Sequence, residues 1–232
     1  MSCVKKIIFF PHAGGLAYSY FKLARKVEEN TGISTSVYEY AGRGERQKEA
    51  AFIDFKAAIE SIHQDIYKNF PADNYIFFGH SMGSYIALEV AKYMMNEGKN
   101  VNALFVSGLT SPNFKKIDVN KMNDENIMRY LKVLNKNRGE IVEKESLKKM
   151  YMNIIKNDFL LINSYIECHK QTKPFKKLIV LYGLEDPLIK EEKLEEWTKL
   201  ENEHFDIATY AGNHFYIFGK EEELGKDICG WI

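Results

Sequence analysis

The fold is decided by a stretch in the first half of the chain, Tyr75-Ile76-Phe77-Phe78-Gly79-His80-Ser81-Met82-Gly83-Ser84. Its four leading apolar residues are typical of a buried strand, and a helical pattern follows from Met82 to about Asn96. Gly79, Ser81 and Gly83 match the pattern Gly-x-Ser-x-Gly, in which a sharp strand-to-helix turn lifts a serine hydroxyl clear of a sheet. Glycines flank the serine because a strained backbone and close helix packing leave no room for side chains. The alternative is a glycine-rich turn with an incidental serine.

Apolar strands alternate with amphipathic helices on both sides of this turn. We expect strands at 7–10, 34–40, 75–78, 103–106, 178–182 and 205–210, and helices at 18–29, 52–70, 82–96 and 191–200, with one more helix closing the chain. This alternation predicts an α/β fold, with a mainly parallel sheet and helices on both faces.

The alternation stops between about Ser111 and Lys173, where only helical patterns occur. One of them places apolar residues at i, i+3, i+4 and i+7, namely Ile127, Tyr130, Leu131 and Leu134, and another spans about 146–170. Together with the serine motif, this predicts one α/β-hydrolase domain over residues 1–232, with a helical lid inserted at about 111–173.

A serine needs a base to be nucleophilic at neutral pH. Of the six histidines, His214 is the best candidate, because it follows the strand expected at 205–210 and so lies at a carboxyl end. The other five lie before that strand, in helical patterns, within the serine motif or in another loop: His204, His63, His169, His80 and His12.

An acid must hold the imidazole in the right tautomer and stabilise its cation. Asp186 follows the strand expected at 178–182, again at a carboxyl end. Glu185 is the adjacent competitor, and Asp158 in the lid is a further alternative. The order Ser81, Asp186, His214 is the order in which α/β-hydrolases carry their catalytic triad.

The oxyanion that forms during acyl transfer needs backbone N–H donors. Met82, directly after the serine, supplies one at the start of a helix. For the second we choose Ala13, in the loop that follows the first strand. A plain structural turn is the alternative explanation for the Gly14-Gly15 pair in that loop.

Composition excludes several classes of protein. The 232 residues are 45% hydrophobic and 28% charged, with 32 basic and 32 acidic residues, which argues against general nucleic-acid binding. No apolar run approaches the length of a membrane-spanning helix, and we expect no membrane association. Three cysteines (Cys3, Cys168, Cys229) without a secretory leader predict reduced thiols and a cytoplasmic location. Metal-ligand spacings are absent from the sequence, so we expect no metal.

Charge is uneven along the chain. Residues 113–177 carry 15 Lys/Arg against 8 Asp/Glu, whereas residues 178–232 carry 5 against 13. A solvated helical face explains the basic segment, and docking of an acidic partner is the alternative. Arg43 and Arg46 follow the strand expected at 34–40. They suit a phosphate or an acidic surface, but we favour a solvated or structural role.

Several motifs together resemble the type II thioesterases that accompany nonribosomal peptide and polyketide synthetases. They are residues 10–15 (Phe-Pro-His-Ala-Gly-Gly), 41–46 (Ala-Gly-Arg-Gly-Glu-Arg), 79–83, 157–159 (Asn-Asp-Phe), 183–186 and 212–215 (Gly-Asn-His-Phe), and they span nearly the whole chain. Two loop positions depart from the family pattern: Ala41 stands where proline is usual, and Asn213 where glycine is frequent.

The resemblance implies a triad of Ser81, Asp186 and His214, with Ala13 and Met82 as oxyanion donors. It implies an acyl or aminoacyl thioester on the phosphopantetheine arm of a carrier protein as substrate, no cofactor of the enzyme's own, and a synthetase as partner; we expect a monomer. A carboxylesterase or acyl-coenzyme A thioesterase is the alternative enzyme, and a catalytically silent binding module is the alternative outside enzymes. Four lid aromatics are candidates for an acyl channel, with ordinary lid core as the alternative: Tyr130, Tyr151, Phe159 and Tyr165.

Overall fold

The computed structural model describes residues 5–113, 115, 116, 118, 123–134 and 145–232. Six parallel strands form one sheet in the order β2-β1-β3-β4-β5-β6. In chain order the strands are β1 (Lys5–Phe10), β2 (Ser34–Val37), β3 (Asn74–His80), β4 (Asn100–Ser107), β5 (Leu178–Gly183) and β6 (Phe205–Tyr210). The predicted α/β class with a parallel sheet is therefore confirmed.

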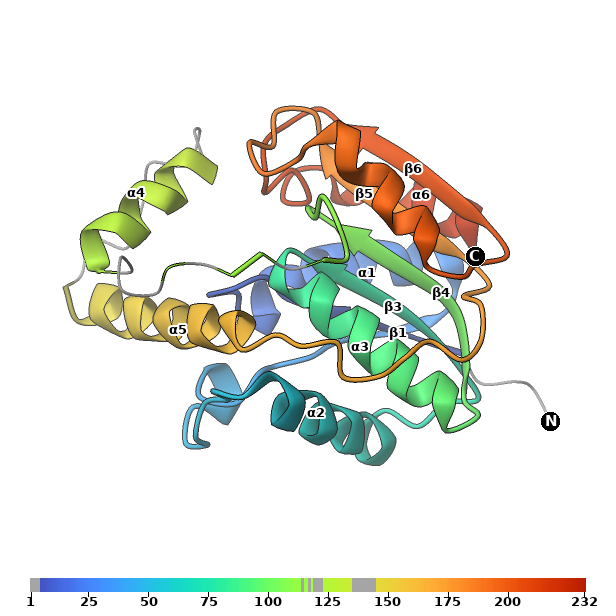
Figure 1. Cartoon of the computed structure of the whole chain (residues 1–232), viewed down its shortest axis with the longest axis horizontal. Helices are drawn as coiled ribbons and strands as arrows, with labels where there is room; N and C mark the ends of the chain where they lie inside the picture. Colours follow the sequence, from blue (N-terminus) through green and yellow to red (C-terminus); the bar gives the residue numbers. More distant parts are fainter. Residues whose placement is uncertain (1–4, 114, 117, 119–122, 135–144) are drawn as a thin grey trace.

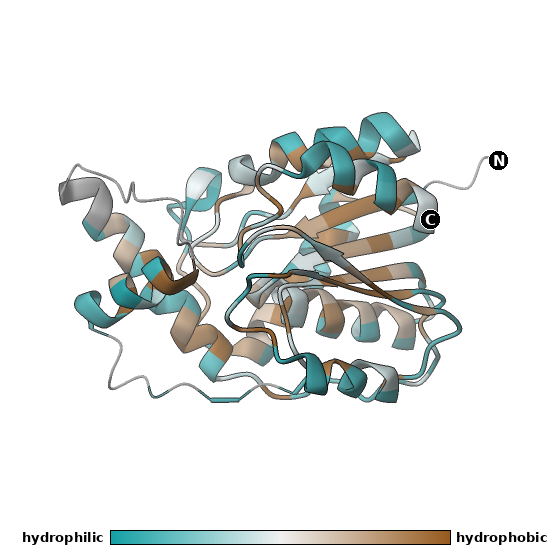
Figure 2. Ribbon diagram, turned by 90° about the horizontal axis from the view of Figure 1, so that it is seen from above, coloured by the Kyte–Doolittle hydropathy of each residue, from teal (hydrophilic) through white to brown (hydrophobic). Residues whose placement is uncertain are grey.

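Helices cover both faces of this sheet, as predicted (Figure 1). On one face lie α1 (Phe21–Thr31) and α6 (Glu221–Trp231), and on the other lie α2 (Phe55–Asn69) and α3 (Met82–Asn96). Alternate residues of β1 serve the two cores: Ile7 and Phe9 pack with the first pair of helices, and Ile8 and Phe10 with the second. The part of a strand that is buried on both faces has to be apolar, which explains the brown stretches of the central strands in Figure 2.

Between β4 and β5 the described residues form two further helices, α4 (Asp124–Leu134) and α5 (Glu145–Asn163), which lie together to one side of the sheet (Figure 1). Parts of the lid predicted at 111–173 fall outside the described residues. The predicted apolar stripe is found in α4. Ile127 and Leu134 are buried, and Tyr130 and Leu131 are half-buried.

The predicted limits of two helices are wrong. The helix predicted at 52–70 begins at Phe55, because the Asp54 carboxylate accepts the Ala57 N–H at 2.8 Å and caps the helix. The helix predicted at 146–170 ends at Asn163. Beyond that point the N–H groups of Cys168 and His169 donate to the carboxylate of Glu89 on α3.

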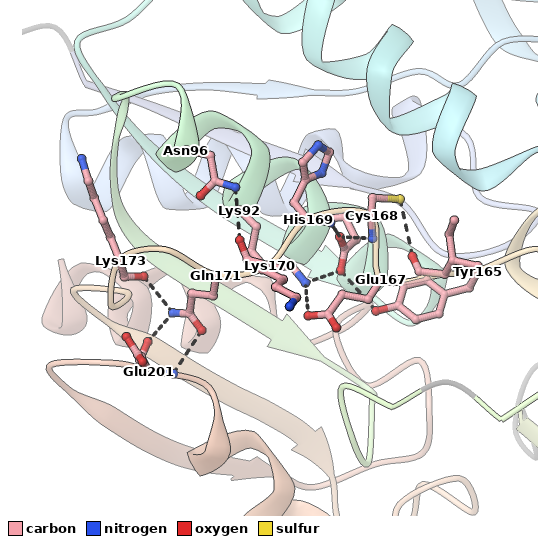
Figure 3. A network of polar contacts seen from close by, with 12 residues as sticks. Lys92, Asn96, Tyr165, Glu167, Cys168, His169, Lys170, Gln171, Lys173 and Glu201 are labelled. Carbon is pink, nitrogen blue, oxygen red and sulfur yellow. Dashed lines mark hydrogen bonds and ion pairs between the residues drawn. The ribbon is translucent and has the colours of Figure 1, made fainter.

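Figure 3 shows this crossing, with Tyr165, Glu167, Cys168 and His169 gathered beside Lys92. Lys92 is buried and forms ion pairs with Glu89 at 2.6 Å and with Glu167 at 3.1 Å. The buried carboxylate of Glu89 is thus one of several contacts that hold the segment between α5 and β5 on α3; Asn96, which donates to the Lys170 carbonyl at 3.1 Å, is another.

Two other predicted elements differ in detail. The strand predicted at 34–40 ends at Val37, although the Tyr38 N–H still donates to the Phe9 carbonyl at 2.9 Å. The helix predicted at 191–200 is a 3₁₀ stretch, η4 (Glu191–Lys199), whose ends show i→i−3 bonds such as Leu200 N–H to Trp197 O. Among the residues that the structure describes, two short 3₁₀ turns accompany these elements, η1 (Ala17–Tyr20) and η2 (Gly44–Arg46). In the described part of the chain, no helix combines the length and the apolar character that crossing a membrane requires.

Candidate active site

Ser81 occupies the turn between β3 and α3. Its φ of 55° and ψ of −121° make it the single non-glycine residue with a positive φ among the described residues. The flanking glycines are required, as predicted. A Cβ on Gly79 would overlap the backbone of Gly83 and Ser84, and a Cβ on Gly83 would overlap the carbonyl of Phe10. The strained turn therefore requires glycine at positions 79 and 83, because neighbouring backbone segments are in direct contact there.

This turn is fastened to the end of the neighbouring strand β4. The Ser81 N–H donates to the Ser107 carbonyl at 2.8 Å. Nearby, the Ser84 hydroxyl lies 2.8 Å from the Gly79 carbonyl and 3.0 Å from the Ser107 carbonyl, and it accepts the Ser107 N–H at 3.0 Å. The hydroxyl of Ser81 therefore stands on a rigid base at the carboxyl edge of the sheet.

Asp186 and His214 form a buried pair at the same edge. Nδ1 of His214 lies 2.7 Å from Oδ2 of Asp186, and the two side chains are 1% and 0% exposed. The other carboxylate oxygen, Oδ1, accepts the Leu188 N–H at 2.9 Å, which fixes the orientation of the carboxyl group. Of the two alternative acids, Glu185 is exposed and Asp158 is paired with Arg43.

The Asp186–His214 pair and the Ser81 turn pack against one common point, Gly108, directly after β4. A Cβ on Gly108 would lie 3.0 Å from Cε1 of His214 and 2.9 Å from Cε1 of His80. Gly108 follows Ser107, whose carbonyl holds the Ser81 N–H. Three stretches far apart in the sequence thus meet at the carboxyl ends of β3, β5 and β6.

Two further histidines, His80 and His12, lie close to His214, and sequence analysis assigned them no role. The ring of His80 is 5.0 Å from that of His214, and its Nδ1 lies 2.9 Å from the Ser107 hydroxyl. Burial, with the neighbouring imidazoles, holds the pKa of His80 well below its usual value. Burial likewise lowers the pKa of His12 to about 3. Both rings are therefore neutral near pH 7, so they add no positive charge beside His214.

The loop after β1 is fixed at nearly every peptide group. The Tyr20 hydroxyl accepts the His12 N–H at 3.0 Å, the Asp158 carboxylate accepts the Gly14 N–H at 2.6 Å, and the His12 carbonyl accepts the Gly15 N–H at 2.8 Å. Within the described part of the chain, the Ala13 N–H has no hydrogen-bond acceptor, and the same holds for the N–H of Met82 at the start of α3. These two amides are the ones expected from the sequence as oxyanion donors.

Comparison with known proteins identifies the family of this chain. Residues 5–231 match the family of thioesterase domains. The chain belongs to the thioesterase domain family. It is 27% identical over 227 residues to a probable cadicidin biosynthesis thioesterase of Streptomyces griseus, covering 97% of this chain but only 61% of that protein. It is 26% identical to the gramicidin S biosynthesis protein GrsT of Aneurinibacillus migulanus, covering 97% of this chain and 87% of the relative.

A solved structure shows the same fold. ClbQ, from the colibactin NRPS/PKS pathway, superposes with a TM-score of 0.87 at 23% identity, covering 98% of this chain and 96% of its own. The α/β-hydrolase fold predicted from the serine motif and the strand–helix alternation is thereby confirmed.

This thioesterase also contains a buried ion pair that sequence analysis missed. Arg43, in the loop after β2, forms a two-pronged pair with Asp158 of α5, with Nη1 2.7 Å from Oδ2 and a second bond from Nη2 to Oδ1. The two side chains are 3% and 2% exposed. Sequence analysis favoured a solvated or structural role for Arg43, and burial of its side chain beside Asp158 shows that the role is structural. Since the partners lie 115 residues apart, no local pattern could have found the pair. Arg46 instead pairs with Asp65 and Glu49.

The four lid aromatics do not lie together in the thioesterase. Tyr130 packs edge-on against Phe159, with ring centroids 5.8 Å apart, and burial together with the Asp186 charge raises its pKa to about 12. Tyr151 lies beside Gly14, where a Cβ would be 3.4 Å from its ring. Tyr165 packs on Phe55 and Tyr85 and bonds to Glu89, as part of the segment that leads back to β5. Among the described residues, no group of three or more His, Cys, Asp or Glu side chains is arranged to hold a metal ion.

Proposed function

We propose that this thioesterase hydrolyses acyl or aminoacyl thioesters held on the phosphopantetheine arm of a carrier protein, and so removes misplaced groups from a nonribosomal peptide or polyketide synthetase. The buried Asp186–His214 pair, next to the strained Ser81 turn, is the observation that carries the proposal. Support for the substrate class comes from relatives named for cadicidin and gramicidin S biosynthesis and from the fold shared with ClbQ, of the colibactin NRPS/PKS pathway.

In the proposed mechanism His214 takes the proton of Ser81, and the serine oxygen attacks the thioester carbonyl carbon. The C–S bond breaks, His214 returns the proton to the pantetheine sulfur, and an acyl-serine remains. Water, deprotonated by the same imidazole, then attacks the acyl-serine, and the carboxylic acid leaves as Ser81 regains its proton. One water is consumed, and one acid and one thiol are released.

Asp186 holds His214 in the tautomer whose Nε2 is free to accept a proton, and stabilises the imidazolium that forms. The N–H groups of Ala13 and Met82 are the proposed donors to the oxyanion. The mechanism uses side chains and backbone amides of this chain, and the phosphopantetheine belongs to the carrier protein. We further propose that the enzyme acts as a monomer in the cytoplasm and meets the carrier domains there. Tyr130, Tyr151 and Phe159, which lie near Asp186 and Gly14, are proposed to line the acyl channel.

The test compares the wild-type protein with Ser81→Ala on an acylated carrier protein and on the matching acyl-coenzyme A. Hydrolysis should be lost in Ser81→Ala with an unchanged melting temperature, and a fluorophosphonate should label the wild type alone. A higher kcat/KM for the carrier-bound substrate supports the proposal. An equal or higher value for acyl-coenzyme A would favour the small-substrate hydrolase, and failure to label the wild type would favour a silent binding module.

A further inference from the structure

We propose that Asp158, on lid helix α5, is a positioning residue that aligns the oxyanion loop, so that the lid and the oxyanion hole work as one unit. The inference rests on the proposed function, because it concerns the Ala13 N–H as an oxyanion donor. It starts from an asymmetry in the loop. The N–H groups of His12 and Gly15 are held by the body of the protein, through Tyr20 and through the loop itself, whereas that of Gly14 is held by the lid.

One carboxylate oxygen carries this contact. Oδ2 of Asp158 accepts both the Gly14 N–H at 2.6 Å and Nη1 of Arg43 at 2.7 Å. The same Nη1 reaches the Gly15 carbonyl at 3.2 Å. On the carboxyl side of Ala13, the Gly14 N–H therefore bonds to Asp158 and the Gly15 carbonyl to Arg43, and these two charged side chains are almost wholly buried. Charge-assisted hydrogen bonds of this kind are stronger and geometrically stricter than neutral ones.

Arg43 is itself positioned from the sheet side. Its guanidinium lies over the ring of Tyr40 at 5.1 Å, and the Tyr40 hydroxyl donates to the Pro11 carbonyl at 3.0 Å. The loop is thus held at Pro11 by Tyr40 and at Gly15 by Arg43. The acceptor for Gly14 comes from the lid alone.

Direct packing adds to the coupling. Gly14 has a φ of 79°, and a Cβ there would lie 2.7 Å from Cγ1 of Ile155, one helical turn before Asp158 on α5. The loop therefore touches the lid helix with its bare backbone. If α5 moved away, the Gly14 N–H would lose its acceptor and Arg43 would keep an unpaired buried charge, which is strongly unfavourable. A displacement of α5 would thus also misalign the Ala13 N–H, because Gly14, the next residue, is held by α5.

Two double variants separate positioning from stability. Arg43→Met with Asp158→Leu removes both charges and leaves an apolar pair, which favours folding but gives Gly14 no acceptor. Arg43→Gln with Asp158→Asn is equally neutral but keeps an amide oxygen for the Gly14 N–H. We expect kcat for a small acyl thioester to fall roughly 10- to 100-fold in the first pair, less than the roughly 10²- to 10³-fold for removing an oxyanion donor outright, with KM changed little. The second pair should recover at least about tenfold of that loss.

A second readout is affinity for a trifluoromethyl ketone, whose tetrahedral adduct needs the same donors; its loss should parallel the loss of kcat. Asp124→Asn is the matched control, because it breaks the exposed lid pair of Asp124 with Lys156 and leaves Gly14 untouched. Equal kcat in the two double variants, or normal inhibitor affinity in the first pair, would overturn the inference. If either pair fails to fold, the single variant Asp158→Asn decides in its place: it keeps an acceptor for Gly14, so a kcat as low as that of Asp158→Ala would contradict the proposal. If the wild type hydrolyses no thioester, the proposed function fails and the inference with it.

Discussion

Nδ1 of His214 and Oδ2 of Asp186 lie 2.7 Å apart in a region that solvent barely reaches. Replacing Asp186 by Asn keeps a side chain of the same shape but presents an amide where the imidazole needs an acceptor. We predict that kcat of Asp186→Asn falls by about 10³- to 10⁴-fold, because the imidazole is held in the wrong tautomer. Steady-state hydrolysis of an acyl thioester measures this.

The matched control for this variant is Glu185→Gln, one residue earlier and exposed. Its kcat should stay within about twofold of the wild type, since surface substitutions of this kind change little. A larger loss in Glu185→Gln than in Asp186→Asn would show that the wrong acid has been chosen.

Because the backbone of Ser81 is strained, we expect residue 81 to lower the stability of the fold while it holds the serine hydroxyl in place for catalysis. Glycine adopts a φ of 55° and ψ of −121° without strain, whereas alanine is strained in this conformation. We predict that Ser81→Gly unfolds with a free energy about 1 kcal/mol higher than Ser81→Ala, both being inactive. Urea titrations followed by circular dichroism provide the comparison.

The same pair of substitutions at Ser61, inside α2, should show the reverse order. There alanine favours the helix over glycine by roughly 0.5–1 kcal/mol. If alanine were also the more stable choice at position 81, the turn would not be strained in the way described.

Acid should destabilise the protein through its buried histidines. His12 stays neutral in the folded chain because burial lowers its pKa to about 3, whereas in the unfolded chain it is protonated below about 6.5. Between these values the unfolded state binds more protons, so the free energy of unfolding falls as the pH falls, by at most about 1.4 kcal/mol per pH unit from this group. Its contribution is fully present above pH 6.5. His80 acts in the same direction.

Unfolding titrations of His12→Gln at several pH values between 6.5 and 4 test this. The slope of unfolding free energy against pH should become shallower than in the wild type, whatever the variant's stability at pH 7. His204→Gln, at an exposed position, should keep the wild-type slope. An unchanged slope in His12→Gln would contradict the prediction.

The buried carboxylate of Glu89 should matter more for stability than its exposed neighbour. It accepts hydrogen bonds from Lys92, Tyr165 and the backbone N–H groups of Cys168 and His169. We predict that Glu89→Ala costs about 3–5 kcal/mol of unfolding free energy, because buried Lys92 keeps only the exposed Glu167 as a counter-charge and two backbone N–H groups lose their acceptor. Glu167→Gln, whose side chain is 61% exposed, should cost less than about 1 kcal/mol. Similar costs for the two variants would contradict this view of the cluster.

Much of the fold was predictable because it is written in local patterns. The buried run Ile7–Phe10, the start of α3 at Met82 and strand Phe205–Tyr210 follow from apolar periodicity and from glycine placement around Ser81. Helix ends were less predictable. The start of α2 depends on a cap by Asp54, and the segment after α5 bonds to Glu89; neither choice of backbone partner is a matter of periodicity.

By itself the sequence determined which chemical groups stand at the carboxyl ends of the strands, since in a parallel sheet those ends share one edge. Ser81 followed from the Gly-x-Ser-x-Gly motif, and His214 and Asp186 from their places after predicted strands, with Glu185 as the competing acid. Tertiary structure alone decided that Arg43 and Asp158 are partners and that their carboxylate reaches Gly14. The physical reason is that a buried charge is tolerated only beside its counter-charge. Which distant residue supplies that counter-charge depends on how the lid helix packs over the sheet.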